Sequence, residues 1–194
     1  MQSMAIVGLG NPGLEYVDSR HNLGFWLLDK FAEKFNLKFE RLSGFSCLVS
    51  KFIRSGKNIY LIKPMHFMNH SGRELQKFFS VFSVSGEETL IIHDELDLPL
   101  GEYKVSNRKG PGGHNGVSDI RERLGYLPPR LRIGMSGVRE PGTTLSEFVL
   151  SPFSTDEKAY LNKQLPLLIQ SILHFIDLGL DKAMNLVNLK PKFL

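Results

Sequence analysis

Short, unbroken runs of apolar residues recur along the chain and predict strands that are buried on both faces. Residues 5–7 and 89–92 are such runs, and a glycine or a polar residue ends each of them. The pattern predicts further strands at residues 46–53, 58–62, 103–105 and 130–134, with a turn at 55–58 between the first two.

Between and beyond these runs, apolar residues return at helical spacing. Residues 23–35 carry the first such pattern, and Asn22 is placed to cap the predicted helix. Pro166 is expected to kink or interrupt a long helical pattern that begins after Ser154 and reaches about residue 175. The other predicted helices span 71–82, 117–124 and 181–187, and residues 190–194 are expected to form a tail.

The alternation of strands and helices predicts the fold class. We expect a single α/β domain over residues 1–194, with a twisted, mixed and largely parallel sheet, flanking helices and a helical C-terminal segment. A length of 194 residues is enough for one sizeable core. With 42% hydrophobic and 23% charged residues, the composition is that of an ordinary globular protein.

The composition also indicates the cellular compartment in which the protein is expected. No apolar stretch approaches the roughly 20 residues that cross a bilayer, so no membrane association is expected. The first residues carry no basic segment or cleavage site of a signal peptide. The single cysteine, Cys47, excludes an intrachain disulfide and a thiolate-rich metal site, which suits a reducing compartment. The expected location is the cytoplasm.

The net charge of +4 permits a polyanionic partner without requiring one. Basic residues gather on both sides of a glycine pair, Gly112-Gly113, where they could equally be a solvated surface. On charge alone both interpretations stand. The basic residues concerned are Lys104, Arg108, Lys109, Arg121, Arg123, Arg130 and Arg132.

Candidate chemistry is concentrated in five polar segments rich in glycine, asparagine and histidine. Each segment follows a predicted strand or precedes a predicted helix, where α/β folds gather their site-forming loops. Three of their asparagines (Asn11, Asn69 and Asn115), a candidate base and a carboxylate suffice to hydrolyse a carbonyl compound without a metal or a covalent intermediate. The segments lie at residues 8–13, 20–24, 67–72, 93–97 and 112–116.

Alternatives exist for each segment. Gly8, Gly10 and Gly13 match the spacing of a dinucleotide-binding turn, but Pro12 removes a backbone donor and no acidic ribose contact follows. His66 and His70 are four residues apart, but they would not share a helical face and lack a third zinc ligand. We therefore disfavour both a nucleotide site and a metal site.

Single residues are also ambiguous when taken alone. His21 could be a surface or capping residue, and Asp94 could brace a turn; as a pair, the aspartate would fix the tautomer of the imidazole. Asn69 and Asn115 could cap helices, or they could bind an ester carbonyl or a ribose hydroxyl. Packing or local hydrogen bonding is expected for the other histidines, His93, His114 and His174.

In their order and content, the five segments resemble those of bacterial-type peptidyl-tRNA hydrolases. The likeness continues through residues 130–134 and 148–150, so it runs from the first strand to about residue 150. It implies a monomeric α/β enzyme, without cofactor, metal or obligate protein partner, whose substrate is peptidyl-tRNA. The implied reaction is hydrolysis of the ester between a peptide and the 3′ ribose of tRNA.

The resemblance also implies roles for individual residues. His21 is implied as the general base that activates water, Asp94 as the group that orients and stabilises it, and Asn11 as the residue that discriminates blocked from free aminoacyl-tRNA. Asn115 is also suited to placing the water or stabilising the oxyanion. The implied substrate and tRNA contacts are Tyr16, Phe67, Asn69 and Asn115.

One departure from the family concerns the tRNA phosphate. Ser106 stands where the family often has a lysine that holds the 5′ phosphate, while Arg132 matches the companion basic position. Lys104, Arg108 or Lys109 could replace the missing lysine. The alternative function is that of a non-catalytic RNA-binding relative with the same fold, which the presence of His21 and Asp94 disfavours.

Overall fold

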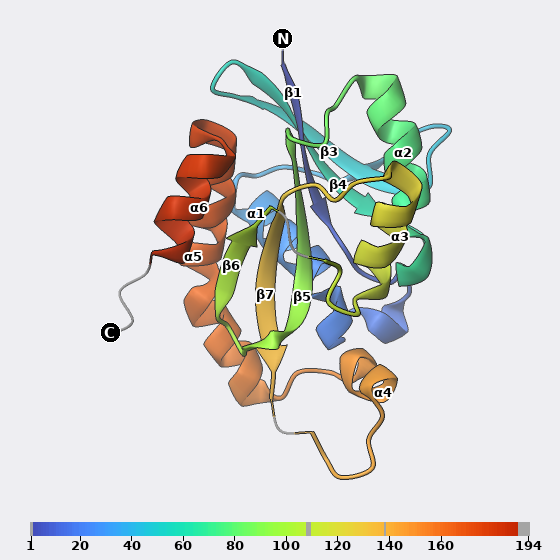
Figure 1. The fold of residues 1–194 in the computed structure, drawn as a ribbon, viewed down its shortest axis with the longest axis vertical. Coiled ribbons are helices and arrows are strands. Elements are labelled where there is room, and N and C mark those ends of the chain that lie inside the picture. The colour runs from blue at the N-terminus through green and yellow to red at the C-terminus, as the bar shows by residue number, and fades with distance from the viewer. Residues whose placement is uncertain (1, 108–109, 138, 190–194) are drawn as a thin grey trace.

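A seven-stranded sheet lies at the centre of the computed structural model, which describes residues 2–107, 110–137 and 139–189 (Figure 1). The central strands pair in parallel and the edge strands antiparallel, as alternating buried strands and helices predict. From edge to edge the strands are β2 (Glu40–Arg41), β3 (Cys47–Arg54), β4 (Lys57–Pro64), β1 (Ser3–Gly8), β5 (Thr89–Pro99), β7 (Arg130–Ser136) and β6 (Tyr103–Ser106).

Helices cover both faces of this sheet (Figure 1). Ile6 and Val7 are consecutive in β1 and point to opposite faces, so each belongs to a different hydrophobic cluster. The predicted mixed, largely parallel α/β fold is confirmed. The cluster of Ile6 includes residues of α1 (Leu23–Lys34), α5 (Thr155–Leu178) and α6 (Leu180–Asn188), and that of Val7 includes residues of α2 (Ser71–Phe82) and α3 (Asn115–Leu124).

Some elements differ from the predictions or add to them. The long helix α5 is continuous through Pro166, so the predicted interruption is wrong. Pro166 is exposed, and the carbonyl group that it leaves without a helical partner can bond to water. The predicted tail at 190–194 lies outside the described residues. The unpredicted elements are β2, α4 (Leu145–Leu150) and the 3-10 turns η1 (Leu14–Tyr16), η2 (Arg20–Asn22) and η3 (Met68–His70).

The course of β5 sets the place of the functional residues. The sequence predicted that this strand ends at Ile92, but it continues along β7 to Pro99. Its pairing with β1 does stop at Ile92, opposite Gly8. Asp94 therefore lies just beyond the carboxyl end of β1, at the edge of a parallel sheet where ligands bind.

Among the helices within the described ranges, none combines the length and the hydrophobicity that crossing a bilayer requires.

Candidate active site

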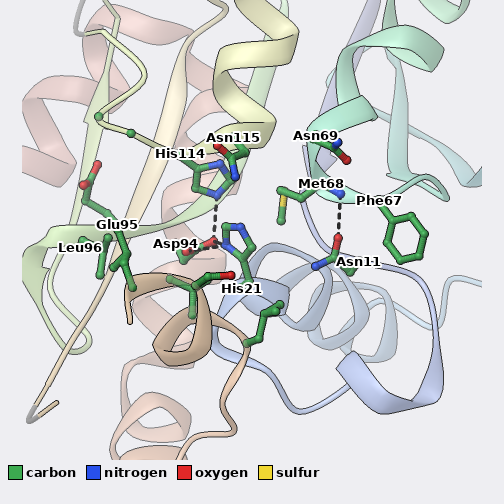
Figure 2. Close-up of a pocket in the computed structure, with 16 residues that line it drawn as sticks. Asn11, His21, Phe67, Met68, Asn69, Asp94, Glu95, Leu96, His114 and Asn115 are labelled. Atoms are coloured by element: carbon green, nitrogen blue, oxygen red, sulfur yellow. Dashed lines mark hydrogen bonds and ion pairs between the residues drawn. The ribbon is translucent and has the colours of Figure 1, made fainter. Parts of the chain in front are cut away.

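A pocket of about 410 Å³ opens at this edge of the sheet (Figure 2). The structure brings six of the predicted site residues to its walls from five separate parts of the chain. Tyr16 stands beside them, with its ring edge-on to Phe67 at a centroid distance of 6.3 Å. The six lining residues are Asn11, His21, Phe67, Asn69, Asp94 and Asn115.

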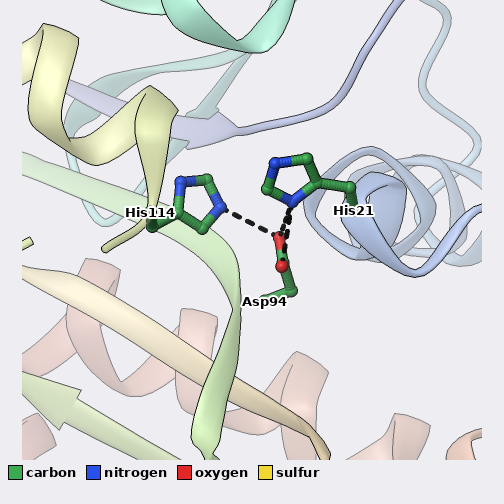
Figure 3. Close-up of side chains that lie close together, drawn as sticks. All are labelled: His21, Asp94 and His114. Atoms are coloured by element: carbon green, nitrogen blue, oxygen red, sulfur yellow. Dashed lines mark hydrogen bonds and ion pairs between the residues drawn. The ribbon is translucent and has the colours of Figure 1, made fainter. Parts of the chain in front are cut away.

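His21 and Asp94 form a buried pair within hydrogen-bonding distance. Nδ1 of His21 lies 3.0 Å from Oδ1 and 2.9 Å from Oδ2 of Asp94, and the two residues are 7% and 2% exposed. A carboxylate only accepts hydrogen bonds, so this contact assigns the proton of neutral His21 to Nδ1. The lone pair of Nε2, which points away from the carboxylate in Figure 3, is then available to accept a proton.

The charge of Asp94 is maintained despite its burial. Burial alone would raise the pKa of Asp94, but the interactions with His114 and His21 outweigh it and hold the pKa well below its usual range. The carboxylate thus stays ionised at any pH at which His21 could act as a base. It can both orient the imidazole and stabilise the imidazolium that forms when His21 takes up a proton.

His114 is a second partner of Asp94 that the sequence analysis did not assign to the site. Nε2 of His114 lies 2.9 Å from Oδ1 of Asp94, while Nδ1 accepts the backbone N–H of Val117 at 3.3 Å. His114 is therefore the N-cap of α3, and its Nε2 carries the proton donated to Asp94. Local hydrogen bonding was expected for this residue, and a histidine placed between a glycine pair and a helix start is the available signal.

The same three side chains bring three possible metal-ligand atoms within 4.8 Å of one another. A cation would need the lone pair of Nε2 of His114. Because Nδ1 of His114 already accepts the N–H of Val117, Nε2 carries the proton and donates it to Asp94, so its lone pair is not available. The hydrogen bonds therefore favour direct use of His21 and Asp94 over metal binding.

Asn11 is fixed so that only its amide nitrogen faces the pocket. Asn22 clamps the backbone of Asn11, with its Oδ1 accepting from the Asn11 N–H at 2.7 Å and its Nδ2 donating to the Asn11 carbonyl at 2.9 Å. Oδ1 of Asn11 accepts the backbone N–H of Met68 at 2.7 Å (Figure 2). Asn22 does stand at the predicted N-cap position of α1, but its amide makes this clamp and no cap hydrogen bond.

Asn69 and Asn115 stand at the rim of the pocket, on η3 and at the start of α3. Both residues are exposed, and no other described residue engages their side-chain amides. Phe67 is 57% exposed beside them, although it is a large aromatic residue. An exposed aromatic ring next to unengaged amides is suited to binding a ligand.

One wall of the pocket comes from α4, which the sequence analysis did not predict. Its residues Leu145, Ser146, Val149 and Leu150 line the pocket. The helix begins with a capping box in which Thr144 accepts the N–H of Glu147 and Glu147 accepts that of Thr144. This Thr-x-x-Glu pattern is the signal that could have identified the helix from sequence.

The predicted phosphate-binding residues are not among those that line the pocket. Arg132 is buried, and its Nε donates to Oε2 of Glu95 at 2.7 Å. Lys104 is exposed and lies opposite Arg132 in the antiparallel pair of β6 and β7. Arg108 and Lys109 lie outside the described residues.

Comparisons with known proteins identify the family of this chain. The family model described as peptidyl-tRNA hydrolase matches residues 5–193. The peptidyl-tRNA hydrolases of Thermodesulfovibrio yellowstonii and Persephonella marina are each 36% identical to the chain, covering 95% and 96% of it and 98% and 97% of their own lengths. The crystal structure of the Acinetobacter baumannii enzyme is 32% identical, with a TM-score of 0.87 over 96% of this chain and 94% of that one. The chain therefore belongs to the peptidyl-tRNA hydrolase family.

Proposed function

We propose that this protein hydrolyses the ester bond between a peptide, or another N-blocked aminoacyl group, and the 3′ ribose of tRNA. The observation that carries the proposal is the buried pair of His21 and Asp94, which leaves Nε2 of His21 available beside a pocket rimmed with amides. Membership of the peptidyl-tRNA hydrolase family supports it.

In the proposed mechanism, Nε2 of His21 removes a proton from a water molecule as the water oxygen attacks the ester carbonyl carbon. Asp94 stabilises the imidazolium through Nδ1. The tetrahedral intermediate collapses by breaking the bond to the ribose oxygen, which takes the proton back from His21. A positioned base of this kind contributes on the order of 10²- to 10⁴-fold to the rate.

The oxyanion needs a hydrogen-bond donor, and Asn11 is suited to provide one. Its Oδ1 is engaged by Met68, so its Nδ2 is the atom offered to the substrate. A single donor of this type contributes on the order of 10²- to 10³-fold. Asn115, at the start of α3, is available to hold the attacking water or a second lone pair of the oxyanion.

The same donor provides selectivity for a blocked amino group. The free α-amino group of an aminoacyl-tRNA has a pKa of roughly 7.7–8.0, so it is largely a cation at neutral pH and only donates hydrogen bonds. It would meet a donor at Asn11 and lose hydration without compensation. A peptide group, in contrast, can offer its carbonyl oxygen to Asn11.

The alternative function, a non-catalytic RNA-binding relative, lacks a supporting observation. Such a protein has no need for an imidazole held by a buried carboxylate, and His21 and Asp94 form such a pair. We further propose that the enzyme acts as a monomer in the cytoplasm, without a cofactor, a metal or an obligate protein partner.

The direct test is the release of labelled amino acid from N-acetyl-aminoacyl-tRNA and from free aminoacyl-tRNA in the presence of a chelator. We expect rapid release from the blocked substrate and little from the free one. Tight binding of tRNA without release would support the non-catalytic alternative. A requirement for added metal would contradict the metal-free mechanism.

A further inference from the structure

Arg20, the residue before the candidate base, is an arginine whose side chain is only 8% exposed. Its guanidinium makes a two-pronged ion pair with Glu157 of α5, with Nη1 2.9 Å from Oε1 and Nη2 2.7 Å from Oε2. The guanidinium carbon also lies over the rings of Phe148 and Phe153, at 4.6 and 4.7 Å from their centroids. These contacts use the planar shape of arginine, which lysine cannot reproduce.

The backbone around Arg20 is also bonded to the segment between α4 and α5. The N–H of Arg20 donates to the carbonyl of Ser151 at 3.0 Å, and Ser19 forms an isolated bridge with Pro152. Nε of Arg20 also lies 3.4 Å from the hydroxyl of Ser151. The turn η2 is therefore joined to the segment between α4 and α5 by both backbone and side chain.

Each of the three residues of η2 holds a different part of the site. Arg20 holds the corner between α4 and α5, His21 bonds to Asp94, and Asn22 clamps the backbone of Asn11. Phe148, one of the rings beneath Arg20, belongs to α4, whose neighbouring residue Val149 lines the pocket. The contacts of Arg20 therefore connect a wall of the pocket with the candidate base.

We propose that Arg20 is a positioning residue that holds His21 and the α4 wall in a fixed relation to each other. The inference rests on the proposed hydrolysis. It gives this arginine a role distinct from binding the tRNA backbone, because its guanidinium is buried against Glu157 and two phenyl rings. A displacement of about 1 Å in the base can cost on the order of 10²-fold in rate.

The charge state of Glu157 is consistent with this arrangement. Burial would raise the pKa of Glu157, but hydrogen bonds from Arg20 and from the Ser154 backbone outweigh it, so the pKa is lowered. Glu157 also completes the capping box of α5 with Ser154. Glutamine can serve in a capping box, so Glu157→Gln weakens the contact with Arg20 while it preserves the helix start.

The test compares Arg20→Lys and Glu157→Gln with a matched pair elsewhere on α5. Arg54 and Asp177 form another two-pronged ion pair, with distances of 2.8 and 2.7 Å, near the opposite end of that helix. Arg54→Lys and Asp177→Asn are therefore the controls. For all variants, kcat and KM on N-acetyl-aminoacyl-tRNA are measured well below the Tm, together with the Tm itself.

We expect Arg20→Lys to lower kcat by about tenfold or more, and Glu157→Gln to lower it by less, with a smaller change in KM. The controls should lower Tm and leave kcat unchanged. A lower Tm with wild-type kcat in both site variants would overturn the inference, because it would reduce Arg20 to a stabilising residue. So would a change confined to KM and its salt dependence, which would make Arg20 a tRNA contact. If the wild type itself is inactive, the proposed function fails instead.

Should Arg20→Lys fail to fold, Glu157→Gln decides the question, since the capping box is retained in it. Its kcat must then fall below that of Asp177→Asn at equal folded fraction. Equal values in the two variants would overturn the inference.

Discussion

Oδ1 of Asn11 accepts the backbone N–H of Met68 at 2.7 Å, and this bond determines what Asn11 can offer a substrate. An amide both donates and accepts, but here the accepting end is engaged. Figure 2 shows the amide nitrogen on the side that faces His21. The proposed mechanism therefore assigns Asn11 the role of a donor to the substrate, in oxyanion stabilisation and in rejection of a free ammonium group.

Exchanging this amide for a carboxylate tests the relationship. In Asn11→Asp the group of equal shape can still accept from Met68 but cannot donate. We expect the rate on N-acetyl-aminoacyl-tRNA to fall by about 10²- to 10³-fold. The ratio of rates on blocked and free aminoacyl-tRNA should fall as well, because the carboxylate attracts an ammonium group. Rates on the two substrates measure this, and an unchanged ratio would be inconsistent with the assignment.

The hydrogen bond from His114 to Asp94 can be tested separately from the role of His114 as a helix cap. Asparagine is among the best N-cap residues, so His114→Asn should preserve the start of α3. Its shorter side chain cannot cap and also reach Asp94. A hydrogen bond to a charged group is worth about 1.5–3 kcal/mol, so kcat should fall by roughly ten- to a hundredfold. A wild-type kcat in His114→Asn would instead show that the contact of His114 with Asp94 does not contribute to catalysis.

The buried side chain of His93 is expected to make the stability of the protein depend on pH. Burial, followed by the neighbouring His114, lowers the pKa of His93 well below its usual range, so it is uncharged in the folded protein. The unfolded chain takes up a proton below about pH 6.5 that the folded state does not bind. His93 therefore does not lower the free energy of unfolding above that pH. Below it, the free energy of unfolding falls by up to about 1.4 kcal/mol per pH unit.

Urea unfolding at pH 7.0 and pH 5.5 measures this effect. In His93→Gln the titrating group is absent, so the variant should lose about 1 kcal/mol less than the wild type between these two pH values. The comparison uses only the change in unfolding free energy between the two pH values. A destabilisation that is the same at both pH values therefore does not affect it. Parallel losses in the two proteins would show that His93 does not contribute.

Binding of tRNA phosphate is expected to involve Lys104. This exposed residue lies opposite Arg132 in the β6–β7 pair, whereas Arg132 itself is engaged by Glu95. Lys104→Gln should weaken tRNA binding and reduce the slope of log K against log salt by about 1. Lys163→Gln, on the exposed side of α5, is the control. Identical slopes in Lys104→Gln and the wild type would exclude Lys104 as a phosphate contact.

Sequence alone predicted most of the sheet and six of the residues that line the pocket. The apolar runs identified β1 and the first part of β5 because strands buried on both faces are almost continuously apolar. His21 and Asp94 were identified because each lies in a distinctive polar segment that occurs in the family order. Their contact, between residues 73 positions apart, required the structure.

The features that sequence reasoning missed depend on partners that are remote in the chain. Asn22 is a plausible helix cap by local rules, and only the position of Asn11 shows that its amide is used as a clamp. Arg20 and Glu157 are 137 residues apart, and no local pattern connects them. Local propensities predict elements, whereas the choice among hydrogen-bond partners is made by tertiary packing.

The central claim is that His21 is the general base, and the most direct measurement is the single-turnover rate of His21→Asn on N-acetyl-aminoacyl-tRNA. Substrate affinity, measured separately, should remain close to that of the wild type, because the substitution removes the base and leaves the asparagines and Phe67 in place. We predict a loss of about 10²- to 10⁴-fold in the rate constant. A rate constant equal to that of the wild type would contradict the assignment of His21 and the mechanism built on it.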